Sequence, residues 1–206
     1  PAQGGQVPYP QGQTSSPAPA PYPPGGYPAT GGQGQPGQLP PSGGGGDPQL
    51  NSRLQQMMAE EKRDFGVQPP SGLHSGQMHG PTPNSIPKGQ VITTLGLYSL
   101  VTRNDVRPLI FDVLGTGETL PGALAAVPAS QPGDLNDQTQ QMFGQYLSQA
   151  TRGNRETPLV FYCQGVQCWM SYNAAVRASG LGYTNVLWYR GGIEAWKYAG
   201  LPVQRG

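Results

Sequence analysis

Charged side chains are scarce in this sequence: Asp, Glu, Lys and Arg make up only 11% of its 206 residues, and the formal net charge is +1. No cluster of Lys and Arg is present that would line up against phosphates, which argues against a nucleic-acid-binding protein. Long hydrophobic runs are also missing, and none approaches the roughly 20 residues that span a bilayer. We therefore expect neither a nucleic-acid partner nor a membrane span within this sequence.

Cysteine is rarer still, with two residues in the whole chain, Cys163 and Cys168. Two cysteines are too few for the disulfide framework of a small secreted protein. They are separated by only five positions, so they belong to one local feature and have to be interpreted together.

Glycine and proline are abundant, with 32 and 24 residues, and together they indicate a large unstructured fraction. The sequence therefore predicts one folded domain with an N-terminal extension. We expect a disordered Gly/Pro/Gln-rich tether over residues 1–48, a short helix over 49–66, a Pro/Gly-rich loop that packs on the domain over 67–85, and the domain itself over 86–206.

The beginning of the sequence bears on localisation. It opens on Pro1 instead of Met, which indicates that an upstream segment is missing, either a removed signal peptide or the remainder of a longer sequence, and residues 1–46 carry no charged side chain. These features predict an exported or periplasmic protein, with a cytoplasmic protein as the alternative. The sequence does not indicate the oligomeric state.

The two histidines, His74 and His79, fall in the Pro/Gly-rich loop, with no carboxylate or cysteine near them in the sequence. A zinc site normally needs three or four protein ligands. We therefore predict no metal site, and no cofactor is expected either.

Apolar runs typical of strands alternate with helical patterns from residue 91 onward. The expected strands are Val91-Ile92, residues 108–114, a short one near 123–128, and residues 157–163 and 186–189. The expected helices begin at Thr93 or Thr94, at Asp134 or Asn136, at Ser171 and near Gly191. This alternation predicts an α/β fold with a central, mostly parallel sheet covered on both faces. Chemistry gathers at the carboxyl ends of strands in such sheets, and Cys163 stands at one.

Cys163 opens a loop that joins a buried strand to a helix at Ser171. Backbone N–H groups of such a loop can point at one centre, and the N-terminal end of the helix adds positive potential there. An anion is stabilised at that centre and a thiol ionises more readily, which would make Cys163 a nucleophile. The alternative is a small hydrophobic residue packed at the end of a strand.

Several segments of the chain resemble, in the same order, the motifs of the rhodanese-like family. They are Leu109-Ile110-Phe111-Asp112-Val113, Leu120-Pro121-Gly122-Ala123, Val160-Phe161-Tyr162-Cys163, Gly182-Tyr183-Thr184-Asn185-Val186, and Arg190-Gly191-Gly192-Ile193-Glu194-Ala195-Trp196 with Gly200-Leu201-Pro202-Val203. The resemblance implies a rhodanese-like three-layer fold and a sulfurtransferase. In that activity Cys163 takes a sulfane sulfur from a donor, holds it as a persulfide, and passes it to a thiol or protein acceptor.

The resemblance also assigns roles to individual residues, with Cys163 as the catalytic one. Substrate binding is expected from the residues that follow it, Gln164, Gly165, Val166, Gln167, Cys168 and Trp169. The amides of Gln164 to Cys168 would cradle the donor and the persulfide, and Trp169 would line the mouth of the pocket. Asp112, Arg190 and Ser171 are expected to support the site. Asp112 would bind loop backbone groups, whereas Arg190 would pair either with Asp112 or with the pocket.

The sequence departs from the family's pattern where a basic residue is usual. Val113-Leu114 stand where the family commonly has an Arg, and no Lys or Arg occurs between Cys163 and Ser171, so thiosulfate lacks its common charge partner. Cys168 adds a second thiol, which could resolve a persulfide or sulfenate on Cys163 by forming a local disulfide. The alternative function is therefore a non-catalytic binding or redox-sensing module that uses the Cys163–Cys168 pair.

A phosphatase or arsenate reductase on the same scaffold is disfavoured. Those enzymes resemble one another in placing an Arg six positions after the nucleophilic cysteine, where it grips an oxyanion with two hydrogen bonds. Trp169 occupies that position in this sequence, and an indole cannot do the same.

Overall fold

The computed structural model describes residues 48–103 and 106–205 of the chain, so the predicted tether lies outside the described residues apart from Pro48. The helices are α1 Pro48–Glu61, α2 Thr94–Thr102, the short 3-10 helix η1 Val127–Ser130, α3 Gln138–Ala150, α4 Met170–Gly180 and α5 Gly192–Tyr198. The strands are β1 Gln90–Ile92, β2 Leu109–Asp112, β3 Glu118–Thr119, β4 Leu124–Ala125, β5 Leu159–Tyr162, β6 Val186–Tyr189 and β7 Gln204–Arg205. The described chain is thus an α/β fold, as predicted.

Five strands form the central sheet in the order β1-β6-β5-β2-β4, and each neighbouring pair is parallel. β5 lies in the middle, where its last residue, Tyr162, pairs with Asp112 of β2 and with Tyr189 of β6. The carboxyl ends of parallel strands meet at one edge of a sheet, the edge at which such folds carry their sites. Cys163, the next residue after β5, therefore stands in the centre of that edge.

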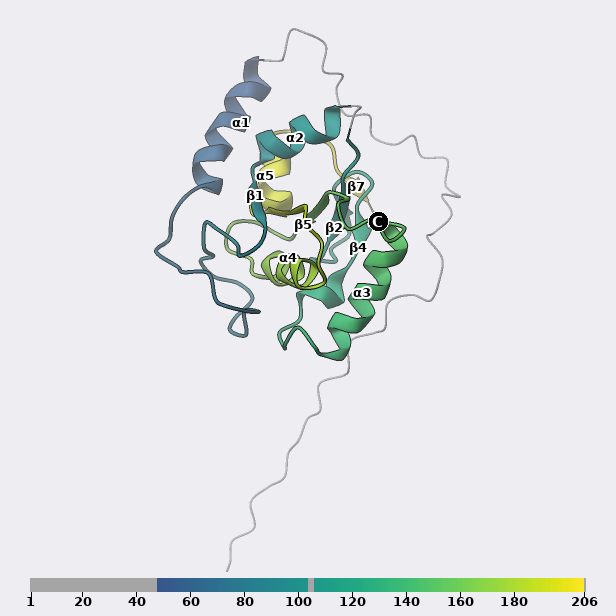
Figure 1. Ribbon diagram of the computed structural model, residues 1–206. Coiled ribbons are helices and arrows are strands. Elements are labelled where there is room, and N and C mark those ends of the chain that lie inside the picture. The colour runs from purple at the N-terminus through teal and green to yellow at the C-terminus, as the bar shows by residue number, and fades with distance from the viewer. Residues whose placement is uncertain (1–47, 104–105, 206) are drawn as a thin grey trace, which may run out of the picture.

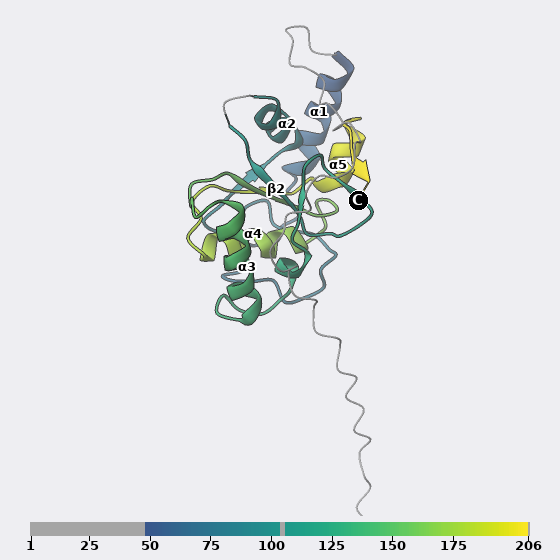
Figure 2. The ribbon, with the colours of Figure 1, turned by 90° about the vertical axis from the view of Figure 1, so that its right-hand side faces the viewer.

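Helices cover both faces of the sheet (Figure 1): α3 and α4 lie on one face, and α1, α2 and α5 on the other. Figure 2 shows the same three layers after a 90° turn. The sequence of β5 accounts for both interfaces, because side chains alternate between the faces of a strand. Leu159 and Phe161 pack in the core with α3 and α4, and Val160 and Tyr162 in the core with α1, α2 and α5. The predicted three-layer fold is confirmed.

The start of α3 differs from the prediction by a few residues. Its N-cap is Asp137, not Asp134 or Asn136, and the Asp137 carboxylate accepts a hydrogen bond from Gln140 N at 2.7 Å. The carboxylate of Asp134 accepts instead from Asn136 N at 2.6 Å. Asp side chains that bind the backbone two residues ahead form turns, so Asp134 shapes the turn before the helix.

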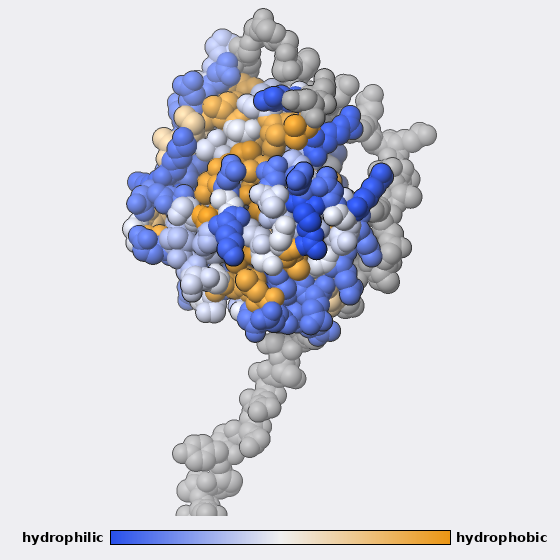
Figure 3. Space-filling view, viewed as in Figure 1, coloured by the Kyte–Doolittle hydropathy of each residue, from blue (hydrophilic) through white to orange (hydrophobic). Residues whose placement is uncertain are grey.

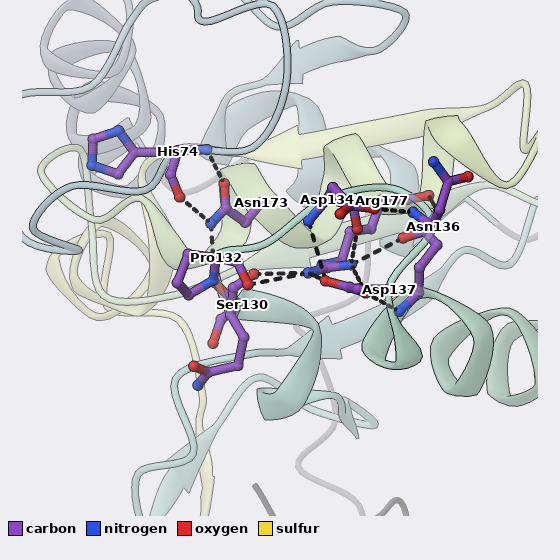
Figure 4. A network of polar contacts seen from close by, with 10 residues as sticks. His74, Ser130, Pro132, Asp134, Asn136, Asp137, Asn173 and Arg177 are labelled. Carbon is purple, nitrogen blue, oxygen red and sulfur yellow. Dashed lines mark hydrogen bonds and ion pairs between the residues drawn. The ribbon is translucent and has the colours of Figure 1, made fainter. Parts of the chain in front are cut away.

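A network of polar contacts joins α4 to its neighbours (Figure 4). Arg177 is fully buried and donates to the two carboxylate oxygens of Asp137 at 2.9 and 2.8 Å. These charge-assisted hydrogen bonds from Arg177 hold the pKa of the Asp137 carboxyl below its ordinary value. Asn173 accepts from His74 N at 2.8 Å and donates to His74 O at 2.9 Å. α4 therefore fixes both α3 and the loop over residues 67–85.

The surface of the domain alternates between hydrophilic and hydrophobic residues on the face that Figure 3 shows. Among the described residues, Tyr198 of α5 is the large hydrophobic side chain that remains exposed.

None of the helices in residues 48–103 and 106–205 combines the length and the apolar character needed to cross a bilayer. β3 and β7 form a separate antiparallel pair, which the sequence analysis did not predict.

Candidate active site

The candidate site is the loop between β5 and α4, residues 163–169, which we call the sulfur loop. A disulfide joins Cys163 to Cys168, with 6.4 Å between the two Cα atoms. Both cysteines are buried, each about 1% exposed. The disulfide therefore links the first residue of the sulfur loop to its last but one.

The sulfur of Cys163 lies against the start of α4. Ser171 N donates to the sulfur at 3.4 Å, the hydroxyl of Ser171 lies 3.1 Å from it, and Cys168 O lies 3.3 Å away. Ser171 in turn accepts a hydrogen bond from the indole N–H of Trp188 at 2.9 Å. The N-terminal end of a helix carries positive potential, so the two Ser171 groups and the helix favour negative charge on the Cys163 sulfur, against the opposing effect of the Cys168 carbonyl oxygen.

The predicted cradle of loop amides is not formed by the end of the sulfur loop. Cys168 N donates to Gly165 O at 3.0 Å, and Trp169 N donates to Met78 O at 2.9 Å. Both amides are therefore directed at carbonyl groups and not at the Cys163 sulfur. The Cys168 amide closes a turn within the loop, and the Trp169 amide binds a segment that is distant in the sequence. Neither amide is available to an anion at the sulfur.

That segment, residues 73–80, runs across the sulfur loop and is called the strap here. Gly80 N donates to Gln167 O at 2.8 Å, and His79 forms an antiparallel bridge with Cys168. The ring of His74 stacks on Trp169 with a centroid distance of 3.9 Å and an interplanar angle of 10°. Trp169, predicted at the pocket mouth, is instead buried beneath the strap. The strap thus covers the loop from one side.

The open side of the sulfur loop borders a hollow of about 410 Å³. Its lining consists of His79, Gly80, Gln164, Gly165, Val166, Gln167, Cys168 and Glu194. Cys168 borders this hollow, whereas Cys163 and Trp169 do not. Five of the predicted substrate-binding residues therefore lie around one space, and Cys168 belongs to its lining although only 1% of its surface is exposed.

Glu194 gives this surface a negative character. It borders the 410 Å³ hollow and two neighbouring ones of about 520 and 190 Å³, and it accepts a hydrogen bond from the Gln164 side chain at 2.7 Å. The 410 Å³ hollow has no Lys or Arg in its lining. The lack of basic residues seen in the sequence of the loop thus extends to the walls around it, which disfavours a dianionic substrate.

Two of the three predicted supporting residues lie where they were expected. Ser171 contacts the Cys163 sulfur, and Asp112 binds loop backbone groups. The Asp112 carboxylate accepts from Leu114 N at 2.8 Å and Gly115 N at 3.2 Å, and so binds the backbone of the loop after β2. These bonds fix the backbone of the next loop at this edge of the sheet.

The predicted pairing of Arg190 with Asp112 or the pocket is wrong. Its guanidinium reaches neither Asp112 nor the hollow, but donates to Glu61 O at 2.7 Å, Arg63 O at 2.8 Å and Thr82 O at 2.9 Å. Its Nε also donates to the Thr82 hydroxyl at 2.9 Å. The chain that leaves α1 fills the space above β6, so Arg190 serves as a buried tie between the N-terminal segment and the domain.

Glu61, Thr94, Tyr189 and Arg190 form what we call the charged corner, beyond the end of β6. The buried Glu61 carboxylate accepts from Thr94 N at 2.8 Å and from the Thr94 hydroxyl at 2.7 Å, which itself lies 2.6 Å from the Tyr189 hydroxyl. Burial raises the pKa of Glu61 to about 7, against the lowering effect of the Thr94 hydrogen bonds. α2 is capped by Thr93, one of the two predicted residues, which leaves Thr94 free to bind Glu61.

Three residues of this edge were missed by the sequence analysis: Glu61, Trp188 and Glu194. Glu194 lies in the first turn of α5, two residues after the glycine pair that follows β6, and a side chain at the functional edge was predictable from that position. Glu61 and Trp188 gave no such local signal, because their roles depend on which distant segments they meet.

A metal site is not formed by the described part of the chain, in which no group of three or more His, Cys, Asp or Glu side chains is placed to hold an ion. His74 Nε2 lies 3.0 Å from Gln77 O within the strap. His79 contributes its backbone to the bridge with Cys168.

Comparison with known proteins identifies the domain. The family model of the rhodanese-like domain matches residues 97–199, half of the chain. Comparison with curated proteins gave no match. Among solved structures, a thiosulfate sulfurtransferase from Pseudomonas aeruginosa is similar, with a TM-score of 0.43 and 16% sequence identity over 57% of this chain. The match spans 20% of the length of that protein.

Proposed function

The chain belongs to the rhodanese-like family, and on that premise we propose that it acts as a thiol–disulfide exchange module in which Cys163 and Cys168 are the reactive pair. The observation that carries the proposal is the bridge between them. Opening the bridge takes two electrons and two protons and leaves two thiols. A partner dithiol that supplies them is oxidised to a disulfide, and the reverse reaction closes the bridge again.

The surroundings of the bridge favour exchange with a thiol over reaction with thiosulfate. The hollow that leads to Cys168 carries Glu194 on its wall and neither Lys nor Arg. The Glu194 carboxylate repels a dianion but not a neutral thiol, and Lys197, which borders the neighbouring hollow with Glu194, is paired with Glu118. The partner proposed here is thus a protein or small-molecule thiol that reaches the bridge through this hollow.

Sulfur transfer is the second candidate, and the donors at Cys163 favour it. A Cys163 thiolate beside Ser171 N and the Ser171 hydroxyl would attack the sulfane sulfur of a donor, and the donor's remaining group would leave with the electron pair. The persulfide formed would then pass its outer sulfur to a thiol acceptor. Alternatively, the Cys168 thiolate would attack the Cys163 sulfur, release hydrosulfide and close the bridge.

One experiment separates the two candidates. The reduced protein is incubated either with oxidised glutathione or with polysulfide, then alkylated and weighed by mass spectrometry, with Cys168→Ser as the matched variant. Exchange predicts that oxidised glutathione closes the bridge in the wild type, blocks alkylation of both cysteines, and leaves a glutathione adduct on the variant. A wild type that keeps two free thiols with the oxidant, yet gains one sulfur atom on Cys163 from polysulfide, would establish transfer and overturn exchange.

We further propose an exported or periplasmic location for the protein. Disulfides persist in oxidising compartments and are rare in a reducing cytosol, and the bridge between Cys163 and Cys168 needs such surroundings to stay closed. Rapid alkylation of fractionated cells tests this proposal. A protein recovered from the cytosolic fraction with two free thiols would contradict it.

A further inference from the structure

The two sulfurs of the bridge lie in different surroundings. Both cysteines are 1% exposed, but Cys168 belongs to the lining of the hollow and Cys163 does not, so a partner would approach the bridge from the Cys168 side. Cys163 instead has a backbone N–H and a hydroxyl beside its sulfur, both from Ser171, at 3.4 and 3.1 Å. In a disulfide exchange the attacked sulfur must be reachable and the leaving sulfur must carry negative charge. The surroundings therefore distinguish an attacked sulfur from a leaving one.

The orientation of the Ser171 hydroxyl is fixed by Trp188. The indole N–H of Trp188 donates to the Ser171 oxygen at 2.9 Å, and an indole N–H can only donate. It therefore occupies one lone pair of that oxygen and leaves the hydroxyl hydrogen to point elsewhere. The Cys163 sulfur, 3.1 Å away, is the acceptor beside it. All three residues are at most 1% exposed, so water does not compete for these bonds.

We propose that Trp188 and Ser171 form a relay of hydrogen-bond donors that makes Cys163 the leaving thiolate of the exchange, with Cys168 as the sulfur that is attacked. This inference rests on the proposed function. A partner thiolate attacks the Cys168 sulfur, and a new disulfide forms between the partner and Cys168. The bond between the two cysteines breaks with its electron pair on Cys163. The Ser171 N–H and O–H stabilise that charge until the second partner thiol closes its own disulfide and both cysteines are released as thiols.

Trp188 and Ser171 are positioning residues in this scheme. Control variants have to distinguish the loss of their hydrogen bonds from a general loss of core packing. Trp188 also packs edge-to-face on Tyr172, with ring centroids 5.2 Å apart. Trp188→Phe keeps an aromatic ring in the core but removes the donor and part of the ring volume. Trp196→Phe is the matched control, since Trp196 is buried and donates its indole N–H to Pro202 O at 2.8 Å. Ser130→Ala controls for Ser171→Ala, because Ser130 is buried and its hydroxyl donates to Val127 O.

The first measurement is the pH titration of the thiolate absorbance of Cys163 in a Cys168→Ser background, which needs no partner. Ser171→Ala is expected to move the titration midpoint upward by about one pH unit, and Trp188→Phe by a smaller amount, because each weakens a hydrogen bond to an anion. Ser171→Thr, which keeps the hydroxyl, restores the midpoint, and both control variants leave it in place. Equal midpoints in all variants would overturn the relay.

The second measurement locates the partner on the bridge. The oxidised protein with native cysteines is treated with limiting glutathione, quenched with N-ethylmaleimide, and fragmented by tandem mass spectrometry. We expect glutathione on Cys168, maleimide on Cys163, and an opening rate about tenfold lower in Ser171→Ala. Glutathione on Cys163 would overturn the assignment while leaving exchange itself intact. A bridge that glutathione does not open in the wild type or the controls would refute the proposed function instead, and the titration would still decide the relay.

Discussion

The sulfur loop and the charged corner lie at the same edge of the sheet, yet different forces hold them. The sulfur loop is closed by a covalent bridge, and its reactive sulfur meets the uncharged donors of Ser171. The charged corner holds a buried carboxyl, Glu61, and a buried guanidinium, Arg190. In the proposed function the sulfur loop exchanges electrons, whereas the Glu61 carboxyl of the charged corner binds and releases a proton near pH 7. One edge of the sheet thus holds the bridge beside uncharged donors and buries a carboxyl and a guanidinium one strand away.

Thr82 joins the two regions. It accepts from Arg190 Nε at 2.9 Å, and its hydroxyl donates to Val166 O in the sulfur loop at 2.6 Å. The start of α5 makes a second connection, because Ile193 N donates to Cys163 O and Glu194 N to Gln164 O, each at 3.0 Å. We therefore expect a substitution in one region to shift the backbone of the other through these hydrogen bonds.

The largest effect is expected from Arg190→Met. The substitution leaves the carbonyls of Glu61, Arg63 and Thr82 without their buried donor, and we expect the free energy of unfolding to fall by about 4 kcal/mol. Urea denaturation measures it. Arg155→Met, at an exposed arginine, serves as the control and is expected to cost less than about 1 kcal/mol. Equal losses in the two variants would show that the charged corner does not hold the fold.

A smaller effect is expected from pH. The pKa of Glu61 is raised from 4.5 to about 7 by burial, so the folded protein binds this proton more tightly than the unfolded chain does. The stabilisation is full below pH 4.5 and is lost as the pH rises to about 7, by about 3 kcal/mol. Urea denaturation across this range should show the slope in the wild type and a flatter one in Glu61→Gln. An unchanged slope in the variant would assign the effect to other groups.

Gly192→Ala breaks the contact between α5 and the sulfur loop. Gly192 has φ +61°, and an added Cβ would lie 2.5 Å from the backbone of Cys163 and Gln164. Because neither backbone can move without disturbing the loop, we expect a loss of stability of about 2–3 kcal/mol and slower closure of the bridge. Gly117→Ala, where the added Cβ meets nothing within 4 Å, is the control. Wild-type stability in Gly192→Ala would contradict the close packing.

The smallest effect is expected from reduction of the bridge. The loop it closes is short, so opening it should lower the free energy of unfolding by about 2 kcal/mol. Urea denaturation with and without a reductant measures this difference, and the same reductant should leave Cys163→Ser unaffected. A loss as large as that of Arg190→Met would mean that the bridge is primarily a structural staple.

Much of this edge was predictable because it depends on local pattern. The continuous apolar run at residues 159–162 predicts a strand buried on both faces, and Cys163 follows at its carboxyl end. Asp112 precedes a turn, where a short carboxylate binds nearby amides. The same local logic could also have singled out Glu194.

The remainder could not be predicted because it depends on tertiary contacts. Arg190 finds its partners more than 100 positions away in the chain that follows α1. The amide of Trp169 is taken by Met78 of the strap, which no spacing within the sulfur loop indicates. Trp188 lies in a strand of buried residues, and only the packing of β6 against the start of α4 brings its indole to Ser171.

The central claim is that the bridge between Cys163 and Cys168 opens and closes reversibly, and a redox titration tests it most directly. The protein is equilibrated in dithiothreitol buffers of graded ratio, and its free thiols are counted by alkylation and mass spectrometry. The account predicts one reversible two-electron transition between two free thiols and none, with no such transition in Cys168→Ser. Two free thiols at every ratio, or a bridge that no ratio opens in the folded protein, would contradict it.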